Sequence, residues 1–242
     1  MPGAMIELPG DPPLPCLTSM PEGDGPFPGV VVVMEVFGLN DHIGSVISHF
    51  GRRGFLAIAP DLYVDHAPGT VIPYGELTRA REIRATLSDT RALEHIGRAV
   101  RWLREHDTLP GAGIVGYCMG GRLSLLAGAK VEGIAAAVGY YPSGLGLVDP
   151  PQGRGNIHAL PLLQDYRVPA LVHFGADDDY IPPDHIGRIA QGLAASKVQT
   201  ELVIHAGAGH AFNNDDRPEA FRQEAARQAW ERTLAFFWSH LG

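Results

Sequence analysis

The stretch Gly116-Tyr117-Cys118-Met119-Gly120-Gly121 decides the fold of this chain. It follows the apolar run 112–116, which predicts a buried strand, and precedes a pattern that predicts a helix beginning near Met119. A cysteine with glycines two residues before and two residues after it fits a nucleophile elbow, a sharp turn from a strand into a helix. The glycines are needed because strand and helix approach closely at such a turn. We therefore expect Cys118 at the end of a strand in an α/β fold.

The predicted position of Cys118 also favours chemistry at its sulfur. The dipole at a helix amino terminus favours a thiolate over a thiol, and the backbone N–H of Met119 would point at a substrate oxyanion. The alternative is a free cysteine that only fills a small space in the core. Cys16, the other cysteine of the chain, lies in a proline-rich segment without such a turn, and we expect it to be structural.

Short apolar runs alternate with helical patterns on both sides of the elbow. Continuous apolar runs are typical of strands buried on both faces. Strands that alternate with helices indicate a mostly parallel central sheet with helices on both faces. We expect one α/β domain over residues 1–242, in which 1–28 form an irregular segment, extended or in a weak edge hairpin. The predicted strands are 29–34, 55–59, 112–116, 134–138, 168–174 and 200–205; the predicted helices begin after 41, cover 75–86 and 88–106, begin near 119, cover 184–196, and run from 216 to about 240 with Pro218 in the first turn.

Composition excludes several classes of protein. Of the 242 residues, 45% are hydrophobic and 19% are charged, which is usual for a globular chain and unlike a disordered one. A net charge of −8 and the absence of a basic patch argue against a nucleic-acid partner. The longest apolar run is far below the ~20 residues that span a membrane, and no signal-peptide pattern is present. We therefore expect a cytoplasmic protein with no membrane partner and with free thiols.

A cysteine nucleophile needs a histidine that handles its proton. His210 lies in the small-residue loop 206–212 directly after a predicted strand, where parallel sheets build their sites. His205 is the nearest alternative, but it ends that strand and lacks the glycine-rich setting. The other histidines are mostly expected at the surface, and four fall on predicted helices: His42, His49, His95 and His106.

The histidine in turn needs an acid that orients it. Asp177, Asp178 and Asp179 follow the preceding predicted strand, and three adjacent carboxylates repel one another, so at least one should have a partner. Charge alone does not choose among them, and a solvated turn is the alternative for all three. The order cysteine, aspartate, histidine is nevertheless the order of α/β-hydrolases.

Several segments of the chain together resemble the dienelactone hydrolase family, the carboxymethylenebutenolidases. The resemblance runs from about residue 28 to the end. A Glu-x-Phe-Gly-x-Asn segment combined with a cysteine elbow is specific, because ordinary serine esterases have neither. The matching segments are Val33 to Asn40, Gly54 to Tyr63, Gly116 to Gly121, Gly175 to Pro182 and Gly209 to Phe212.

The resemblance implies roles for particular residues. It selects Asp178 among the three aspartates, and it implies that Glu35 lies beside Cys118 and takes the thiol proton when substrate binds. Glu35 directly ends an apolar strand, so we expect it to be partly buried, which makes a carboxyl group a better proton acceptor. The alternative is a structural carboxylate paired with an arginine such as Arg122. By the same resemblance, the N–H of Val36 completes the oxyanion hole with that of Met119.

One departure from the family concerns the substrate. Family members use arginines to hold a substrate carboxylate, one of them a few residues after the histidine, where this chain has the uncharged or acidic residues 213–216. Arg79, Arg81 and Arg84 are the remaining cations, although a solvated helix face explains them equally well. We therefore expect a lactone or small ester other than a dienelactone. The candidate substrate contacts are Phe37, Tyr63, Arg81, Tyr141 and Phe212.

The sequence thus predicts a hydrolase of a lactone or small carboxylic ester, with a triad of Cys118, Asp178 and His210. No cofactor is expected, and no metal, because the histidines show no metal-ligand spacing. The expected assembly is a monomer or a homodimer. Two alternatives remain: a thioesterase or esterase of the same fold with another substrate, and a non-catalytic relative that uses the thiol for binding or redox sensing.

Overall fold

The computed structural model describes residues 3–106, 108–149 and 156–242. Its centre is one eight-stranded sheet with the strand order β1-β2-β4-β3-β5-β6-β7-β8. The pairs β1–β2 and β2–β4 are antiparallel, and all other pairs are parallel. The strands are β1 (Ala4–Leu8), β2 (Leu14–Ser19), β3 (Phe27–Val33), β4 (Leu56–Pro60), β5 (Thr108–Tyr117), β6 (Ile134–Tyr140), β7 (Ala170–Gly175) and β8 (Thr200–His205).

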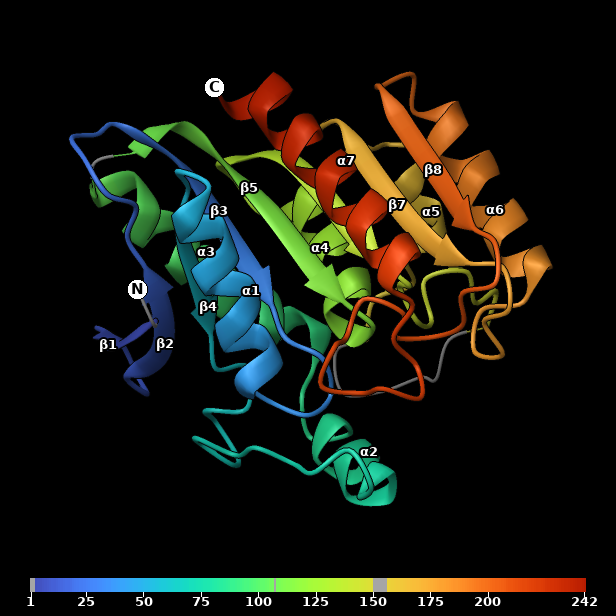
Figure 1. Ribbon diagram of the computed structural model, residues 1–242, viewed down its shortest axis with the longest axis horizontal. Coiled ribbons are helices and arrows are strands. Elements are labelled where there is room, and N and C mark those ends of the chain that lie inside the picture. Colours follow the sequence, from blue (N-terminus) through green and yellow to red (C-terminus); the bar gives the residue numbers. More distant parts are fainter. Residues whose placement is uncertain (1–2, 107, 150–155) are drawn as a thin grey trace.

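Helices cover both faces of the sheet, as the alternating pattern predicts (Figure 1). On one face lie α1 (Asp41–Arg52) and α7 (Gln223–Leu241), which meet through the rings of Phe50 and Trp230. On the other face lie α3 (Asp89–Glu105), α4 (Met119–Lys130), α5 (Leu160–Leu163) and α6 (Pro183–Ala195). The remaining helix, α2 (Leu77–Arg84), lies beyond the ends of the strands, beside the loops that follow them.

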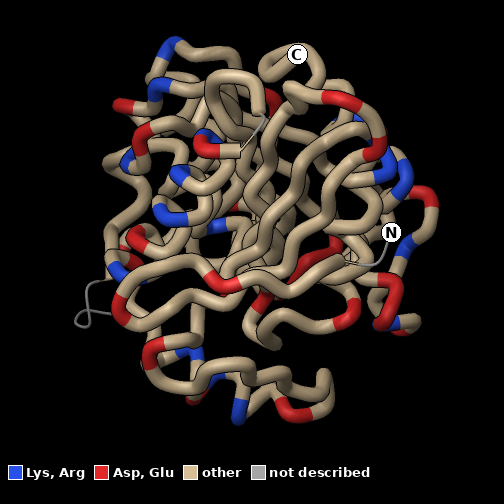
Figure 2. Tube along the Cα trace, turned by 90° about the vertical axis from the view of Figure 1, so that its left-hand side faces the viewer, with Lys and Arg blue, Asp and Glu red and all other residues tan. Residues whose placement is uncertain are grey.

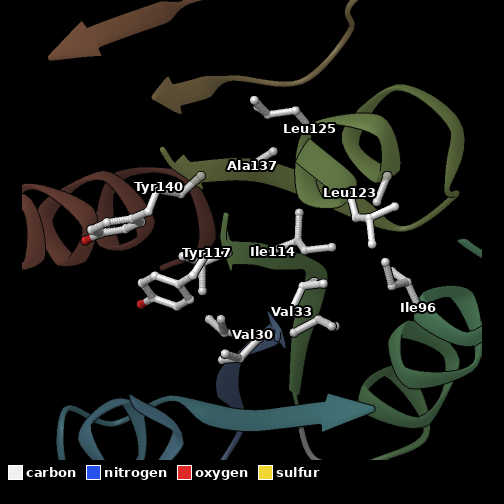
Figure 3. Close-up of a cluster of buried hydrophobic side chains, with 14 of the residues drawn as sticks. Val30, Val33, Ile96, Ile114, Tyr117, Leu123, Leu125, Ala137 and Tyr140 are labelled. Atoms are coloured by element: carbon white, nitrogen blue, oxygen red, sulfur yellow. The ribbon is translucent and has the colours of Figure 1, made fainter. Parts of the chain in front are cut away.

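The core forms on both faces because side chains of a strand alternate between them. Figure 3 shows Tyr117 and Tyr140 on one side of β5 and β6, and Leu123 with Ile96 on the side of α4 and α3. Val30 to Val33 are fully buried in β3, which explains why this strand is apolar without interruption. At the surface, acidic and basic positions are mixed over the face that Figure 2 presents.

Two predicted elements differ from the structure. Residues 1–28 are not irregular as a whole: β1 and β2 form the edge hairpin, and β2 is joined to the sheet through β4. The last helix begins at Gln223 and not at 216 with Pro218 in its first turn, because turns occupy the preceding residues and the Arg222 N–H donates to the Phe212 carbonyl at 3.0 Å. The stretch 142–167 is rich in glycine and proline, from which we expect an active-site loop. It lies partly outside the described residues, since 150–155 are not among them.

No described helix combines the length and the apolar character that crossing a bilayer requires. The loops after β3, β5, β7 and β8 all leave the same edge of the sheet, at the lower side of Figure 1. The predicted site residues follow these four strands in the chain. The sheet therefore brings together residues that are far apart in sequence.

Candidate active site

Cys118 lies between β5 and α4 in a turn with a strained backbone. Its φ of 54° and ψ of −114° are values that residues with a side chain rarely adopt. A Cβ atom at Gly116 would collide with the carbonyl oxygen of Gly120, and one at Gly120 would collide with that of Val33. Both positions therefore require glycine, and the sharp strand-to-helix turn predicted from the sequence is confirmed.

The ladder between β3 and β5 brings Glu35 close to Cys118. Val33 pairs with Gly116 in this parallel ladder, and Glu35 and Cys118 each lie two residues farther along the chain. Both also act on the same neighbour: burial raises the pKa of Tyr141 well above its usual value, and the charges of Glu35 and Cys118 raise it further. A carboxylate and a thiol thus share one small region at the edge of the sheet.

His210 and Asp178 form a close pair in the loops that follow β8 and β7. The Nδ1 atom of His210 lies 2.8 Å from the Oδ2 atom of Asp178. The other carboxylate oxygen of Asp178 accepts a hydrogen bond from the Tyr180 N–H at 2.8 Å. Asp178 is buried whereas Asp177 and Asp179 are exposed. The aspartate that pairs with His210 is therefore Asp178, the one that the family resemblance selects.

Cys118 also lies close enough to His210 to affect the ionisation of its imidazole. Burial favours the neutral imidazole, but the negative charge of Cys118 and the hydrogen bond to Asp178 outweigh it and raise the pKa of His210. Cys118 is partly exposed, and the side chain of His210 is 14% exposed. The pair of His210 and Asp178 therefore lies near a sulfur atom that solvent can reach.

Glu35 is buried, and its partner differs from the one considered in the sequence. The Oε2 atom of Glu35 accepts a hydrogen bond from Nδ2 of Asn214 at 2.9 Å, and Asn214 is itself fully buried. Arg122 does not pair with Glu35. Its guanidinium donates two hydrogen bonds to Asp89, at 2.7 and 2.8 Å. Asn214 was not among the predicted site residues, because the only unusual feature of residues 213–216 in the sequence is that they include no cation.

The backbone amides predicted for an oxyanion hole belong to residues that directly follow Cys118 and Glu35 in the chain. Met119 is the first residue of α4, where the N–H groups have no acceptor within the helix. Val36 follows Glu35 directly, and its carbonyl accepts a hydrogen bond from the hydroxyl of Tyr63 at 3.0 Å. Tyr63 is 1% exposed, so its hydroxyl holds the Val36 peptide in place, and its contact with substrate stays a prediction.

The other aromatic candidates are all buried, but they pack against different neighbours. Tyr141 packs edge-on against the His210 ring, with centroids 5.0 Å apart. Phe37 is buried against Tyr74, with centroids 4.8 Å apart and an edge-on geometry. Phe212 is fully buried among Tyr140, Tyr141 and His205. Phe212 therefore supports the site from the core and does not line it, contrary to expectation.

The arginine of α2 that is directed into the protein is Arg84 and not Arg81. Arg81 is exposed, and Arg79 pairs with Glu76 at the surface. The guanidinium of Arg84 donates to the Leu87 carbonyl at 2.8 Å and lies 3.2 Å from Asp89, and burial lowers its pKa. The sequence could not choose between these arginines because the orientation of α2 depends on its packing against Phe37 and neighbouring residues.

Two histidines expected at the surface of helices are buried. His42 is 1% exposed and lies 3.3 Å from Asp215, and His95 is fully buried and lies 2.8 Å from Asp65. His205, the alternative to His210, is buried and hydrogen-bonds with His173 at 3.2 Å. Within the described ranges, no three or more His, Cys, Asp or Glu side chains are grouped so that they could hold a metal ion.

A mostly parallel eight-stranded sheet with this elbow after β5 defines an α/β-hydrolase-fold protein. Comparison with known proteins narrows the class. The sequence model of the dienelactone hydrolase family matches residues 14–241. The "Putative carboxymethylenebutenolidase" of Yersinia pestis is 32% identical over 234 residues, which cover 94% of this chain and 84% of that protein. The "Probable 2-oxo-3-(5-oxofuran-2-ylidene)propanoate lactonase" of Bradyrhizobium sp. is 31% identical over 221 residues, covering 90% and 86%.

The solved structures agree with the sequence comparisons. The crystal structure of a "Putative Dienelactone Hydrolase" from Klebsiella pneumoniae superposes with a TM-score of 0.89 at 30% identity, and the match covers 98% of each chain. The chain therefore belongs to the dienelactone hydrolase family, and it is a carboxylic ester hydrolase similar to the carboxymethylenebutenolidases.

Proposed function

We propose that this protein hydrolyses a lactone or small ester through a thioester intermediate on Cys118. The observation that carries the proposal is the close pair of His210 with the buried carboxylate of Asp178, together with the strained strand-to-helix turn that presents the nearby Cys118. A nucleophile, a base and an orienting acid in hydrogen-bond contact are the arrangement that covalent catalysis needs. The name of the Bradyrhizobium relative, a lactonase, supports a lactone as one substrate class.

The first half of the reaction forms the thioester. The thiol proton of Cys118 passes to Glu35, and the thiolate sulfur attacks the carbonyl carbon of the substrate. The amides of Val36 and Met119 stabilise the oxyanion that forms. The carbon–oxygen bond to the leaving group then breaks, and His210 donates a proton to that oxygen. The close contact with the Asp178 carboxylate supports this role, because an adjacent negative charge stabilises the protonated imidazole.

The second half releases the product. Neutral His210, oriented by Asp178, takes a proton from a water molecule, whose oxygen attacks the thioester carbonyl. The carbon–sulfur bond breaks, the carboxylic acid leaves, and Cys118 recovers its proton from Glu35. For a lactone, both product groups remain on one molecule, a hydroxy acid. Each group of the enzyme thereby returns to its starting state without a metal or a cofactor in any step.

The first prediction tests the triad directly. Turnover of p-nitrophenyl acetate and of a small lactone is measured for the wild type, Cys118→Ala and His210→Ala. We expect both variants to lose at least ~100-fold in kcat/KM, because nucleophile and proton transfer are each worth that much or more. Asp177→Asn, next to Asp178 but exposed, is the matched control and should keep the wild-type rate. Equal turnover in all four proteins would refute the proposal, and would favour a thiol used for binding or redox sensing.

A further inference from the structure

Asn214 binds Glu35 within a hydrogen-bond network whose other members, Tyr74 and Asn40, are not part of the proposed triad. Its Nδ2 atom donates to Oε2 of Glu35 at 2.9 Å and lies 3.1 Å from the hydroxyl oxygen of Tyr74. The same hydroxyl oxygen accepts a hydrogen bond from Nδ2 of Asn40 at 2.9 Å. The network thus joins three parts of the chain to the carboxylate that lies beside the thiol.

The orientation of the Asn214 amide is determined by its surroundings. Its Oδ1 atom accepts a hydrogen bond from the backbone N–H of Asp216 at 3.1 Å. An oxygen is required there because an N–H can only donate, so the amide nitrogen faces Glu35. The next residue, Asp215, anchors the loop to α1 through buried His42 at 3.3 Å. The donor that faces Glu35 is therefore held in one position from both sides.

Asn214 supplies a hydrogen bond without supplying a charge. The two arginines that approach the neighbouring region, Arg84 and Arg122, both pair with Asp89. A buried carboxylate that accepts a neutral hydrogen bond is stabilised in its ionised form, but less than one beside a cation. Such a carboxylate is positioned and can still accept a proton, which is what the proposed step at Cys118 requires of Glu35.

We infer that Asn214 is a positioning residue, which holds the Glu35 carboxylate in the orientation that accepts the proton of the Cys118 thiol. This inference rests on the proposed function, because it gives Asn214 a role only if Glu35 receives that proton. It also implies that the side of the site formed by residues 213–216 suits an uncharged part of the substrate. A substrate carboxylate placed there would face Glu35 with no cation from this loop.

The pH dependence of thiol alkylation separates this role from a purely structural one. The titratable groups that face Glu35 are Cys118, Tyr74, Tyr117 and Tyr141, and Asp216 and Arg217 lie around Tyr74. Burial raises the pKa of Tyr74 to about 12 and those of Tyr117 and Tyr141 well above 10. These phenols stay protonated between pH 5 and 9, so a midpoint in this range reports the thiol and its proton acceptors.

The second prediction concerns this midpoint, measured with the neutral reagent iodoacetamide in excess. We expect Asn214→Ala to move it upward by about one pH unit, because a Glu35 carboxylate that is no longer held in place accepts the thiol proton less readily. Asn214→Asp should move it at least as far, because it places a second carboxylate beside Glu35. Tyr74→Phe should move it in the same direction by less. Asn213→Ala and Asn213→Asp, at the neighbouring half-buried position, are the matched controls and should leave it unchanged.

Failure of this inference differs from failure of the proposed function. If Cys118→Ala still hydrolyses esters, the proposed function is refuted. If Cys118→Ala is inactive and Glu35→Gln changes the alkylation profile, but a folded Asn214 variant keeps the wild-type midpoint, only the role of Asn214 is refuted. Circular dichroism identifies the variants that fold. If Asn214→Ala does not fold, the midpoint is measured on Asn214→Asp, which keeps the size of the side chain, and on Tyr74→Phe, which changes a partly exposed residue.

Discussion

At the scale of single residues, strain is concentrated next to the sulfur. Cys118 and Tyr141 both have positive φ angles, 54° and 36°, although neither is a glycine. Each such residue costs about 1–3 kcal/mol. Backbone hydrogen bonds hold both in place: the Cys118 N–H donates to the Tyr140 carbonyl at 3.0 Å, and the Tyr141 N–H donates to the His173 carbonyl at 2.7 Å. The rest of the fold therefore stabilises a geometry that presents the thiol at the surface.

The third prediction is that Gly120→Ala destabilises the protein. A Cβ atom at this position would overlap the carbonyl oxygens of Val33 and Met34, which belong to rigid backbone. Overpacking of this kind costs at least about 1–3 kcal/mol, and the elbow should distort so that activity falls as well. Urea unfolding and ester hydrolysis measure the two effects.

Gly187→Ala is the matched control for Gly120→Ala. Gly187 is an exposed residue of α6, and a Cβ atom there would meet nothing within 4 Å. Because alanine favours a helix more than glycine does, the protein should become more stable by about 0.5–1 kcal/mol. Equal effects of the two substitutions would contradict the close contact between the elbow and β3.

At the scale of elements, one buried ion pair joins helices that carry the site. Asp89, the first residue of α3, is fully buried and accepts two hydrogen bonds from Arg122 of α4. Arg84 of α2 lies 3.2 Å from the same carboxylate. The Ile157 N–H also donates to Asp89, at 2.7 Å. One carboxylate thus ties α2, α3, α4 and the segment around residue 157 to one another.

The fourth prediction is that Asp89→Asn lowers the free energy of unfolding by about 3–5 kcal/mol, because it leaves Arg122 buried without a counter-charge. Urea denaturation measures the loss. Glu231→Gln, which removes a partner of the exposed Arg227 on α7, is the matched control and should leave the midpoint of unfolding unchanged within error. A comparable loss in both variants would show that burial does not distinguish the two ion pairs.

At the scale of the whole molecule, buried histidines make stability depend on pH. His173 is fully buried between His205 and Thr233, at 3.2 and 3.3 Å. Burial, and then the charges of His205 and Arg232, lower the pKa of His173 well below its usual value. In the unfolded chain this group takes up a proton as the pH falls through about 6.5, whereas in the folded chain it does not. The unfolded state then binds more protons, and stability falls.

The fifth prediction is that the free energy of unfolding decreases between pH 6.5 and 5, by up to about 1.4 kcal/mol per pH unit for each such histidine. His173→Gln should reduce this slope, and His66→Gln, at an exposed position, should not. His210 contributes to stability over a different pH range, because its pKa is raised in the folded state. Its contribution to the free energy of unfolding is fully present below about pH 6.5 and is lost as the pH rises through the folded pKa. Urea denaturation at pH 5.0, 6.0 and 7.0 distinguishes the contributions, and identical slopes in all variants would contradict the prediction.

Much of the fold and the main features of the site could be predicted from the sequence. The reason is that both signals are local: an apolar run predicts a buried strand, and glycines two residues before and after Cys118 allow the close approach of strand and helix that a sharp turn requires. The last helix was placed too early because Pro218 is acceptable in a helix, and only the hydrogen bond between Arg222 and Phe212 rules out an earlier start. His42 and His95 were placed at the surface because helical position alone does not reveal burial against a carboxylate.

By itself, the sequence determined the family, the mostly parallel sheet and the turn that carries Cys118, because each depends on residues close together in the chain. Only the tertiary structure decided which donor faces Glu35, which arginine of α2 is directed into the protein and which carboxylate holds Arg122. Glu35 and Asn214 are 179 positions apart, and they meet because the sheet order places the ends of distant strands at one edge. Such contacts result from packing, and no periodicity or spacing in the sequence predicts them.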